Sequence, residues 1–312
     1  MSLETKEYQA MNSNFKNLLQ LHFLVIIWGF TAVIGLFVQT SSITLVMYRT
    51  LLAAIGILVV ILLRNKTSKP DFFKNVWPMI GVGCIVGIHW LAFFGAGRLS
   101  NASISLAGFS TCSLWTAILS PIFYKRRVRL LEIMLGLVVV LGLYVILRFQ
   151  FDQALGLGMG IFAGFCSALF AILNSFLTKT NDVSVMTFWE MLSACICVVL
   201  FIPIFSFSTG EVIPLWPSAK DWVWIAVLAW GCTVYPFTMA NVLLRKISPF
   251  TVSLALNLEP IYGIILAVLF FGNTEHMNLG FYIGAGIILS AVLVYPILER
   301  KIVSKASEKQ IP

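Results

Sequence analysis

The stretch ITLVMYRTLLAAIGILVVILL at residues 43–63, followed directly by the basic stretch RNKTSKP at 64–70, decides the fold class. An α-helix rises 1.5 Å per residue, so these 21 residues can cross a hydrocarbon core of about 30 Å. A lipid-exposed chain must satisfy its backbone groups internally, and the stretch lacks the two-residue alternation of a membrane barrel strand. We therefore expect a transmembrane helix here, with Arg49 as its only charged residue.

The same reasoning predicts ten spans along the chain. The chain is 59% hydrophobic and 11% charged, whereas a soluble domain is typically about 25% charged, so lipid is the expected solvent. The predicted spans are residues 18–38, 43–63, 77–97, 101–123, 130–148, 154–178, 184–207, 220–243, 249–271 and 277–298. The sequence therefore predicts an all-α membrane protein.

Positive charge is distributed unevenly between the two sides of the predicted bundle. Of the 21 Lys and Arg residues, 17 fall in the termini and in the connections that share a side with the amino terminus. Only Arg98, Arg148 and Lys220 fall at the opposite ends of the spans. By the positive-inside rule both terminal segments, residues 1–17 and 299–312, are cytoplasmic. This pattern explains the net charge of +8 without a nucleic-acid partner.

An internal repeat relates the two halves of the chain. The triplet at 105–107, Ser-Leu-Ala, recurs at 253–255, and Tyr48 to Ala53 resembles Trp189 to Ala194. These matches lie in corresponding spans of the two halves and favour a duplication of five helices.

The predicted halves are residues 18–148 and 154–298. Because each half has an odd number of spans, the second enters the membrane upside down relative to the first. Inverted repeats recur in secondary transporters, whose binding sites lie near the midplane between the halves. We expect a cavity there, lined by the first, third, fourth, sixth, eighth and ninth spans.

Short motifs give the chain a family resemblance over residues 18–298. They are Trp28-Gly29, the Leu258-Glu259-Pro260 turn followed by Ile261 to Gly272, and the Gly280 to Gly284 spacing. On these the chain resembles the EamA branch of the drug/metabolite transporter superfamily. The resemblance implies a ten-helix carrier that exports amino acids, metabolites or drugs. Members of the family often have Gly-Glu directly after the fourth and ninth spans. This chain departs from that pattern at both places, with Tyr124-Lys125-Arg126-Arg127 after the fourth span and Gly272-Asn273-Thr274-Glu275 after the ninth.

Polar and aromatic residues inside the spans are the candidate site, because a charge at a helix centre costs about 2.5 to 3.5 kcal/mol on insertion scales. The expected cargo-binding residues are Trp28, His89, Trp90, Trp115, Asn257, Glu259 and Tyr262. Pro260 cannot donate to the Leu256 carbonyl, so a kink is expected beside Glu259. Each of these residues has an alternative interpretation as a helix-packing or internally hydrogen-bonded group.

Arg49 and Glu190 occupy corresponding places in the repeat and are candidate gating or coupling residues, together with Glu259. Arg49 is about six residues from the outer end of its span and Glu190 about six from the inner end of its own, so their depths differ by roughly 12 Å. A direct ion pair would need a bent or strongly tilted helix. Snorkelling without a transport role is the alternative. Proton coupling through Glu190, Glu259 or His89 is left open beside transport driven by cargo concentration alone.

Small residues predict how the helices pack. Gly156, Gly160 and Gly164 form a small-xxx-small stripe, and Ser105 and Ser253 are expected to make hydrogen bonds between helices. The six cysteines lie in apolar stretches without CxxC spacing, so no metal site is expected.

The motifs of the main membrane enzyme classes are missing from the sequence. It has no HExxH, no GxxxxGK[ST] and no GxSxG, so neither an enzyme nor a cofactor is expected. A channel would show rings of charged or carbonyl groups. We expect a secondary transporter that works by alternating access in the plasma membrane of a bacterium, with the bilayer and a small cargo as partners and with oligomeric state undecided. The cargo expected is an amino acid or amphipathic compound leaving the cytoplasm, and a membrane-embedded enzyme or channel is the alternative.

Overall fold

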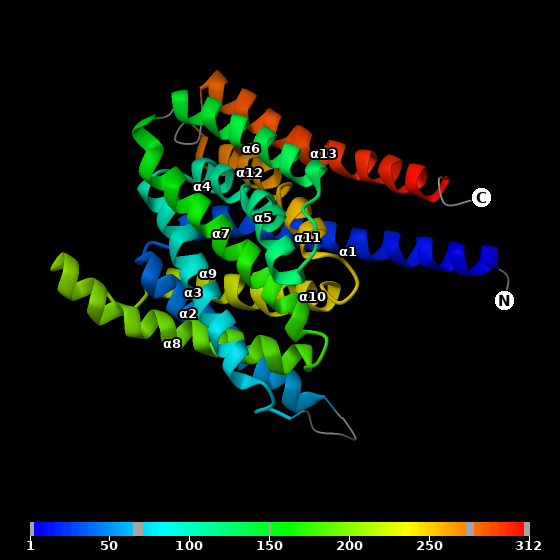
Figure 1. Ribbon diagram of the computed structural model, residues 1–312. Coiled ribbons are helices and arrows are strands. Elements are labelled where there is room, and N and C mark those ends of the chain that lie inside the picture. Colours follow the sequence, from blue (N-terminus) through cyan, green and yellow to red (C-terminus); the bar gives the residue numbers. More distant parts are fainter. Residues whose placement is uncertain (1–2, 65–70, 150, 273–277, 309–312) are drawn as a thin grey trace.

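The computed structural model describes residues 3–64, 71–149, 151–272 and 278–308, and every regular element among them is a helix (Figure 1). The elements are α1 (Leu3–Phe37), α2 (Ser42–Leu63), α3 (Val76–Leu99), α4 (Ala102–Phe109), α5 (Cys112–Tyr124), α6 (Leu130–Phe149), η1 (Phe151–Gln153), α7 (Ala154–Leu177), α8 (Val183–Thr209), α9 (Ala219–Ala226), η2 (Val227–Val234), α10 (Tyr235–Leu243), α11 (Pro249–Leu256), α12 (Glu259–Phe271) and α13 (Leu279–Glu308). Outside the described residues lie Lys66, Lys69, Lys309, the Asn273 to Glu275 part of the family departure, and Met277 at the start of the tenth predicted span.

Eight helical segments of the described chain are long and apolar enough to cross a membrane. They correspond to the predicted spans other than the fifth and tenth. Those two fall on α6 and α13, where the described apolar stretches are shorter, Leu130–Gly142 and Leu279–Ala291. The helices α6 and α13 lie side by side at one edge of the bundle, and the start of α1 and the end of α13 lie at the same end of it (Figure 1).

The fourth span of each half is broken. The break in 249–271 lies beside Glu259, where a kink was expected, whereas no break was expected in 101–123. In both halves an eight-residue helix, α4 or α11, is followed by a thirteen-residue helix, α5 or α12. In the first half Ser110 Oγ donates to the Ala107 carbonyl at 2.6 Å and Thr111 Oγ1 to the Gly108 carbonyl at 2.8 Å, and such bonds bend helices. In the second half the break lies where Pro260 has no N–H to donate. The matching breaks support the repeat.

The eighth span combines three helical segments of two forms, α, π and α, in one continuous run. Between α9 and α10 lies a π-helix, η2, which the sequence did not predict. Thr233 Oγ1 in this segment donates to the Leu228 carbonyl at 2.8 Å. Turns of π-helix are rare, and those that occur are often found at functional sites, so this segment is a candidate part of a functional site.

Close backbone contacts hold α7 against α4. A Cβ added to Gly160 would lie 2.8 Å from the Ser105 carbonyl oxygen and 3.2 Å from Gly108 Cα, so only glycine fits there. Gly156 and Gly164 lie on the same face, against Ser100 and Thr111. The predicted glycine stripe therefore lies at an interface between helices.

Two serines hydrogen-bond across helix boundaries. Ser105 Oγ donates to the Phe93 carbonyl at 2.9 Å, which ties α4 to α3. Ser253 Oγ accepts from Thr116 Oγ1 at 2.8 Å, which ties α11 in the second half to α5 in the first. These are the interhelical bonds expected from the sequence.

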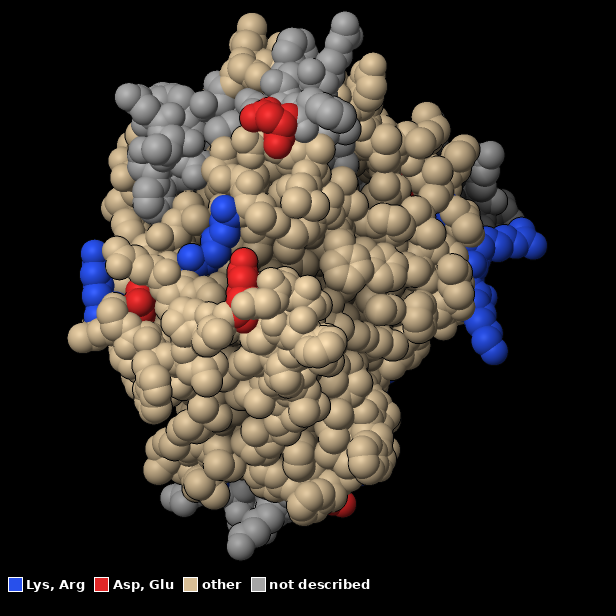
Figure 2. Space-filling model, turned by 90° about the vertical axis from the view of Figure 1, so that its left-hand side faces the viewer, with Lys and Arg blue, Asp and Glu red and all other residues tan. Residues whose placement is uncertain are grey.

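Charged residues are scattered singly over the end of the bundle opposite the start of α1 (Figure 2). Figure 2 looks onto this end, where a handful of charged residues stand among uncharged ones. The opposite end holds a vestibule with a volume of about 360 Å³, lined by Arg126, Arg129, Lys179, Arg245 and Lys246 among others. The difference between the two ends follows the pattern of the positive-inside rule.

Candidate functional site

A cavity of about 70 Å³ lies between the two halves. All six of the expected spans line it, and so does α2, which was not expected to. Its lining residues are Trp28, Thr31, Arg49, His89, Trp90, Phe93, Phe109, Ser167, Phe170, Ala171, Phe237, Ala240, Asn241, Leu244, Val252, Leu256 and Glu259. The volume holds a few water molecules and is well below the roughly 300 Å³ of a small ligand pocket.

Arg49 projects from α2 into this cavity and is 1% exposed. Its Nε donates to Thr233 Oγ1 at 2.8 Å, and its guanidinium carbon lies 4.2 Å from the Trp90 ring centroid. A second aromatic ring, Phe94, lies 5.4 Å away. Its Nη1 has no hydrogen-bond partner among the described residues. The site therefore presents a positioned, largely dehydrated cation with unused donors.

Glu259 stands at the first position of α12 and lines the same cavity at 5% exposure. Within the described part of the chain its carboxylate has no hydrogen bond and no ion pair, with Arg49 or with any other residue. The carboxyl group stands at a helix N-terminus, where the helix dipole would favour its charged form. Two opposite charges thus line one cavity without touching each other.

Glu190 lies outside the cavity lining and is joined to it through Asn241. Asn241 Nδ2 donates to Glu190 Oε2 at 3.2 Å, and Asn174 Nδ2 donates to Asn241 Oδ1 at 3.0 Å. All three side chains are at most 2% exposed. Arg49 and Glu190 form no ion pair, in keeping with the depth difference inferred from the sequence.

Aromatic rings form most of the remaining wall. His89 packs against Phe109 and Phe170, with ring centroids 5.6 and 5.4 Å apart. Its Nδ1 donates to the Ala163 carbonyl at 2.8 Å, so the other ring nitrogen carries no proton in the neutral form. Trp28 Nε1 donates to the Cys232 carbonyl of the π-helix at 3.2 Å. The walls therefore suit an apolar group between the two charges.

The cavity shares one lining residue with each of two neighbouring pockets. Leu244, which is 6% exposed, lines both the cavity and the vestibule at the termini end of the bundle. Phe93 lines both the cavity and a pocket of about 10 Å³ that also includes Arg98. The vestibule is the larger of these two neighbouring pockets.

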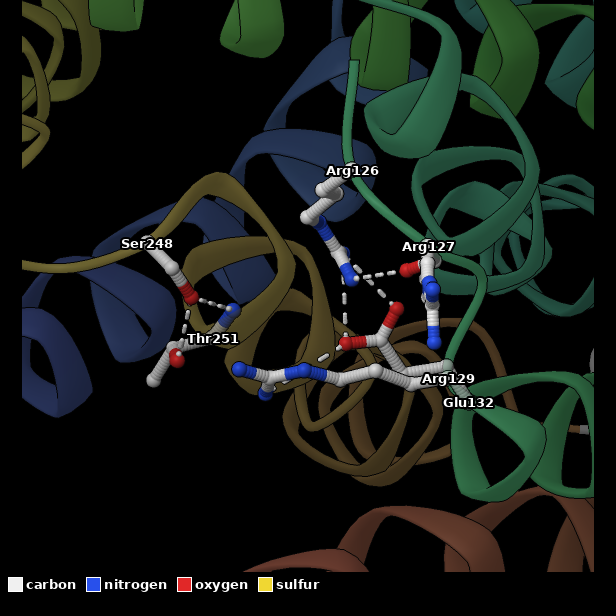
Figure 3. A network of polar contacts seen from close by, with 6 residues as sticks. All are labelled: Arg126, Arg127, Arg129, Glu132, Ser248 and Thr251. Atoms are coloured by element: carbon white, nitrogen blue, oxygen red, sulfur yellow. Dashed lines mark hydrogen bonds and ion pairs between the residues drawn. The ribbon is translucent and has the colours of Figure 1, made fainter. Parts of the chain in front are cut away.

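A polar network stands at the wall of this vestibule (Figure 3). Glu132 of α6, which is buried, accepts from Arg126 Nη2 at 2.9 Å and lies 3.8 Å from Arg129 Nη1. Ser248, from the other half, lies across from this network and caps α11 by accepting from the Thr251 amide at 3.1 Å. The vestibule wall therefore includes residues from both halves.

Both halves of the chain match one family of known proteins. Residues 17–148 and 154–295 each match the model of the EamA-like transporter family. The chain belongs to the EamA-like transporter family. One copy of the family model matches each half, in agreement with the two-repeat layout, and membership makes the chain a transporter-like, multi-pass membrane protein.

Solved structures share the fold of this EamA-family protein. One of them, titled only "Crystal structure of protein", has a TM-score of 0.66 at 14% identity and covers 90% of this chain and 97% of its own. In all, 27 chains of solved structures match. No curated protein sequence matches.

The fold brings together some of the residues that the sequence nominated and leaves others apart. Trp28, Arg49, His89, Trp90 and Glu259 share the cavity. Three nominated residues do not line it: Trp115 packs against Phe165, Asn257 donates to Ser113 Oγ at 2.7 Å, and the Tyr262 hydroxyl pairs with His22 Nε2 at 2.8 Å. Asn257 instead joins the two broken spans, and Tyr262 joins α12 to α1.

Sequence reasoning missed Thr233, Asn241 and Leu244 in this EamA-family site. Thr233 and Asn241 hydrogen-bond the two buried charges Arg49 and Glu190, and Leu244 separates the cavity from the vestibule. Asparagine inside an apolar span was an available signal, since its amide needs partners there. Leu244 carries no such signal, because its position alone distinguishes it.

Proposed function

We propose that this EamA-family protein is a secondary carrier for small zwitterionic molecules with an apolar side group, of which amino acids are the simplest. The observation that carries the proposal is that Arg49 and Glu259, an ionisable base and an ionisable acid, are both buried on one cavity and form no ion pair with each other. A cargo carboxylate would accept from Arg49, and a cargo ammonium would donate to Glu259. The aromatic wall from His89 to Phe237 would then surround the apolar group.

Burial makes this arrangement selective. A charge taken out of water without a partner costs several kcal/mol, and a ligand that supplies both partners offsets that cost. A molecule with only one of the two charges leaves the other protein charge unpaired, which penalises it. We therefore expect a zwitterion to bind more tightly than a simple cation or anion.

Alternating access is the mechanism that we propose for the movement. Leu244 lines both the cavity and the vestibule, and Phe93 lines both the cavity and the small pocket beside Arg98. In this proposal these two side chains act as the gates, and rocking of the halves opens one of them at a time. Glu190, which reaches the cavity through Asn241, would take part in coupling or gating. We further propose that the chain crosses the membrane ten times with both termini in the cytoplasm, and that it exports its cargo across the plasma membrane of a bacterium.

The test is counterflow in proteoliposomes. Vesicles loaded with unlabelled amino acids are expected to accumulate labelled amino acid transiently, whereas the corresponding carboxylic acids and amines without the second charge should fail to exchange. Recovery of unaltered cargo separates a carrier from an enzyme, and saturation separates it from a channel. Equal exchange of the singly charged analogues would contradict the proposed site.

A further inference from the structure

A second, much larger cavity lies on the side of the molecule, in a groove between α3 and α8. Its volume is about 1090 Å³. The walls come from α3, α7, α8, the start of α2 and the segment after α8, and they are mainly apolar: Ile80, Ile88, Leu91, Met159, Ile196, Leu200, Phe201 and Ile204 are examples. It shares no lining residue with the cavity between the halves.

The groove arises because α3 and α8 touch at one level and diverge beyond it. A Cβ at Gly83 would lie 2.8 Å from Glu190 Cα, and one at Gly87 would lie 3.1 Å from the Ala194 carbonyl oxygen. Beyond these glycines the bulky residues Leu91 and Leu200 line the gap. In Figure 1 the last turns of α8 extend away from the rest of the bundle. The gap therefore widens toward the end of the molecule opposite the start of α1.

Lipid is the material that fits these walls. An empty space forfeits the dispersion contacts of its lining, and apolar cavities do not hold water stably. The groove runs along two membrane-spanning helices, from Ile80 to Arg98 on α3, about 27 Å at 1.5 Å per residue. Acyl chains are the apolar groups available at that depth.

The wide end of the groove carries two opposite charges. Arg98 is exposed, its Nη2 donates to the Val38 carbonyl at 2.9 Å, and Asp221 interacts with it electrostatically. Within the described residues its other nitrogens make no hydrogen bond, so donors remain available. Glu211 is exposed as well, and both residues line the groove beside Ser41 and Ser42. Neither Arg98 nor Glu211 forms an ion pair within the described residues.

We propose that this groove binds one phospholipid with a primary ammonium headgroup, phosphatidylethanolamine, in the leaflet remote from the start of α1. The acyl chains fill the space between α3 and α8, the phosphate accepts from Arg98, and the ammonium donates to Glu211. A phosphatidylglycerol headgroup has no cation for Glu211, and a phosphatidylcholine headgroup has no N–H to donate. A second copy of the chain would not supply this pairing of a phosphate and an ammonium with the two charges at the mouth of the groove.

Native mass spectrometry of the full-length, delipidated protein tests the site. The protein is titrated with phosphatidylethanolamine, phosphatidylcholine and phosphatidylglycerol of identical acyl chains. We expect one phosphatidylethanolamine per chain to bind about tenfold more tightly than the other two, the size of one charge-assisted hydrogen bond. Arg98→Gln should weaken all three lipids about tenfold, whereas Glu211→Gln should weaken only phosphatidylethanolamine and remove the preference. Lys220→Gln, an exposed cation at the same end that does not line the groove, is the matched control and should change nothing.

A groove-filling variant locates the acyl chains. Ala92→Phe, on the groove wall of α3, should weaken all three lipids together, and retention of the thermal midpoint checks that the variant folds. Equal affinity for the three lipids in the wild type, or no effect of Glu211→Gln, would overturn the headgroup assignment. A dimer that excludes lipid from the groove would overturn the site itself. None of these outcomes depends on transport, so they are independent of the carrier proposal.

Discussion

Replacing Arg49 with glutamine is expected to reduce amino-acid counterflow by about 100-fold, corresponding to about 3 kcal/mol. Arg49 lines the cavity with an unpartnered Nη1 and is held in place by Thr233 and Trp90. Glutamine keeps a donor and loses the charge, so the cargo carboxylate would be buried without a counter-charge. Arg49→Lys keeps the charge without the planar fork and should lose less, about tenfold. The measurement is the initial rate of counterflow in matched proteoliposomes.

Stability measurements separate this effect from misfolding. Arg49 makes one hydrogen bond, to Thr233, and one close ring contact, with Trp90, together worth about 2 kcal/mol, so the thermal midpoint of Arg49→Gln in detergent should shift by only about 4 °C. The control is Lys74→Gln, which removes an exposed cation that lines neither the cavity nor the vestibule and should leave the exchange rate unchanged. Wild-type exchange in a folded Arg49→Gln protein would show that the guanidinium does not bind cargo.

Replacing Glu259 with glutamine is expected to abolish discrimination between an amino acid and its deaminated analogue. The wild type should prefer the amino acid by about 100-fold, because the analogue leaves the buried carboxylate unpaired. In Glu259→Gln the amino-acid rate should fall until the two rates differ by less than about threefold. Counterflow competition between the two compounds measures the ratio directly.

The control for Glu259 is Asp152→Asn, which removes an exposed acid outside the cavity and should leave the ratio at its wild-type value. Glutamine is nearly isosteric with glutamate, so the cavity shape is preserved. An unchanged rate and an unchanged pH profile in Glu259→Gln would mean that this carboxylate only supports helix packing.

Much of the fold was predictable because lipid imposes simple rules on sequence. The length of each apolar stretch predicts where a helix lies along the chain, and α6 begins at Leu130 as predicted. The distribution of Lys and Arg predicts only which ends of the helices face the cytoplasm. The breaks within 101–123 and 249–271 were predicted only in part. Pro260 indicates the second, whereas the first depends on Ser110 and Thr111 bonding back to their own helix, which side chains do in only some helices.

The candidate site was predictable where a charged residue lies inside an apolar span, because moving a charge into lipid costs free energy. Arg49 and Glu259 were nominated because a buried charge must be compensated, and both line the cavity. Trp115 was nominated by depth alone, but depth does not say which way a helix face points, and Trp115 packs against Phe165 instead. The π-helix that brings Thr233 to Arg49 has no pattern in hydropathy, because a π-turn differs from an α-turn only in its hydrogen bonding.

Cysteine accessibility in the cavity tests the central claim most directly. Ser167, buried in the cavity wall, is replaced by cysteine in a variant without the six native cysteines, and membrane-impermeant thiol reagents are applied to right-side-out and inside-out vesicles. We expect labelling from both sides, slowed from each side by amino acid, and loss of labelling only from the vestibule side when Leu244→Trp fills the space between the cavity and the vestibule. Labelling from neither side, or labelling that amino acid does not slow, would contradict a cargo cavity that opens to each compartment in turn.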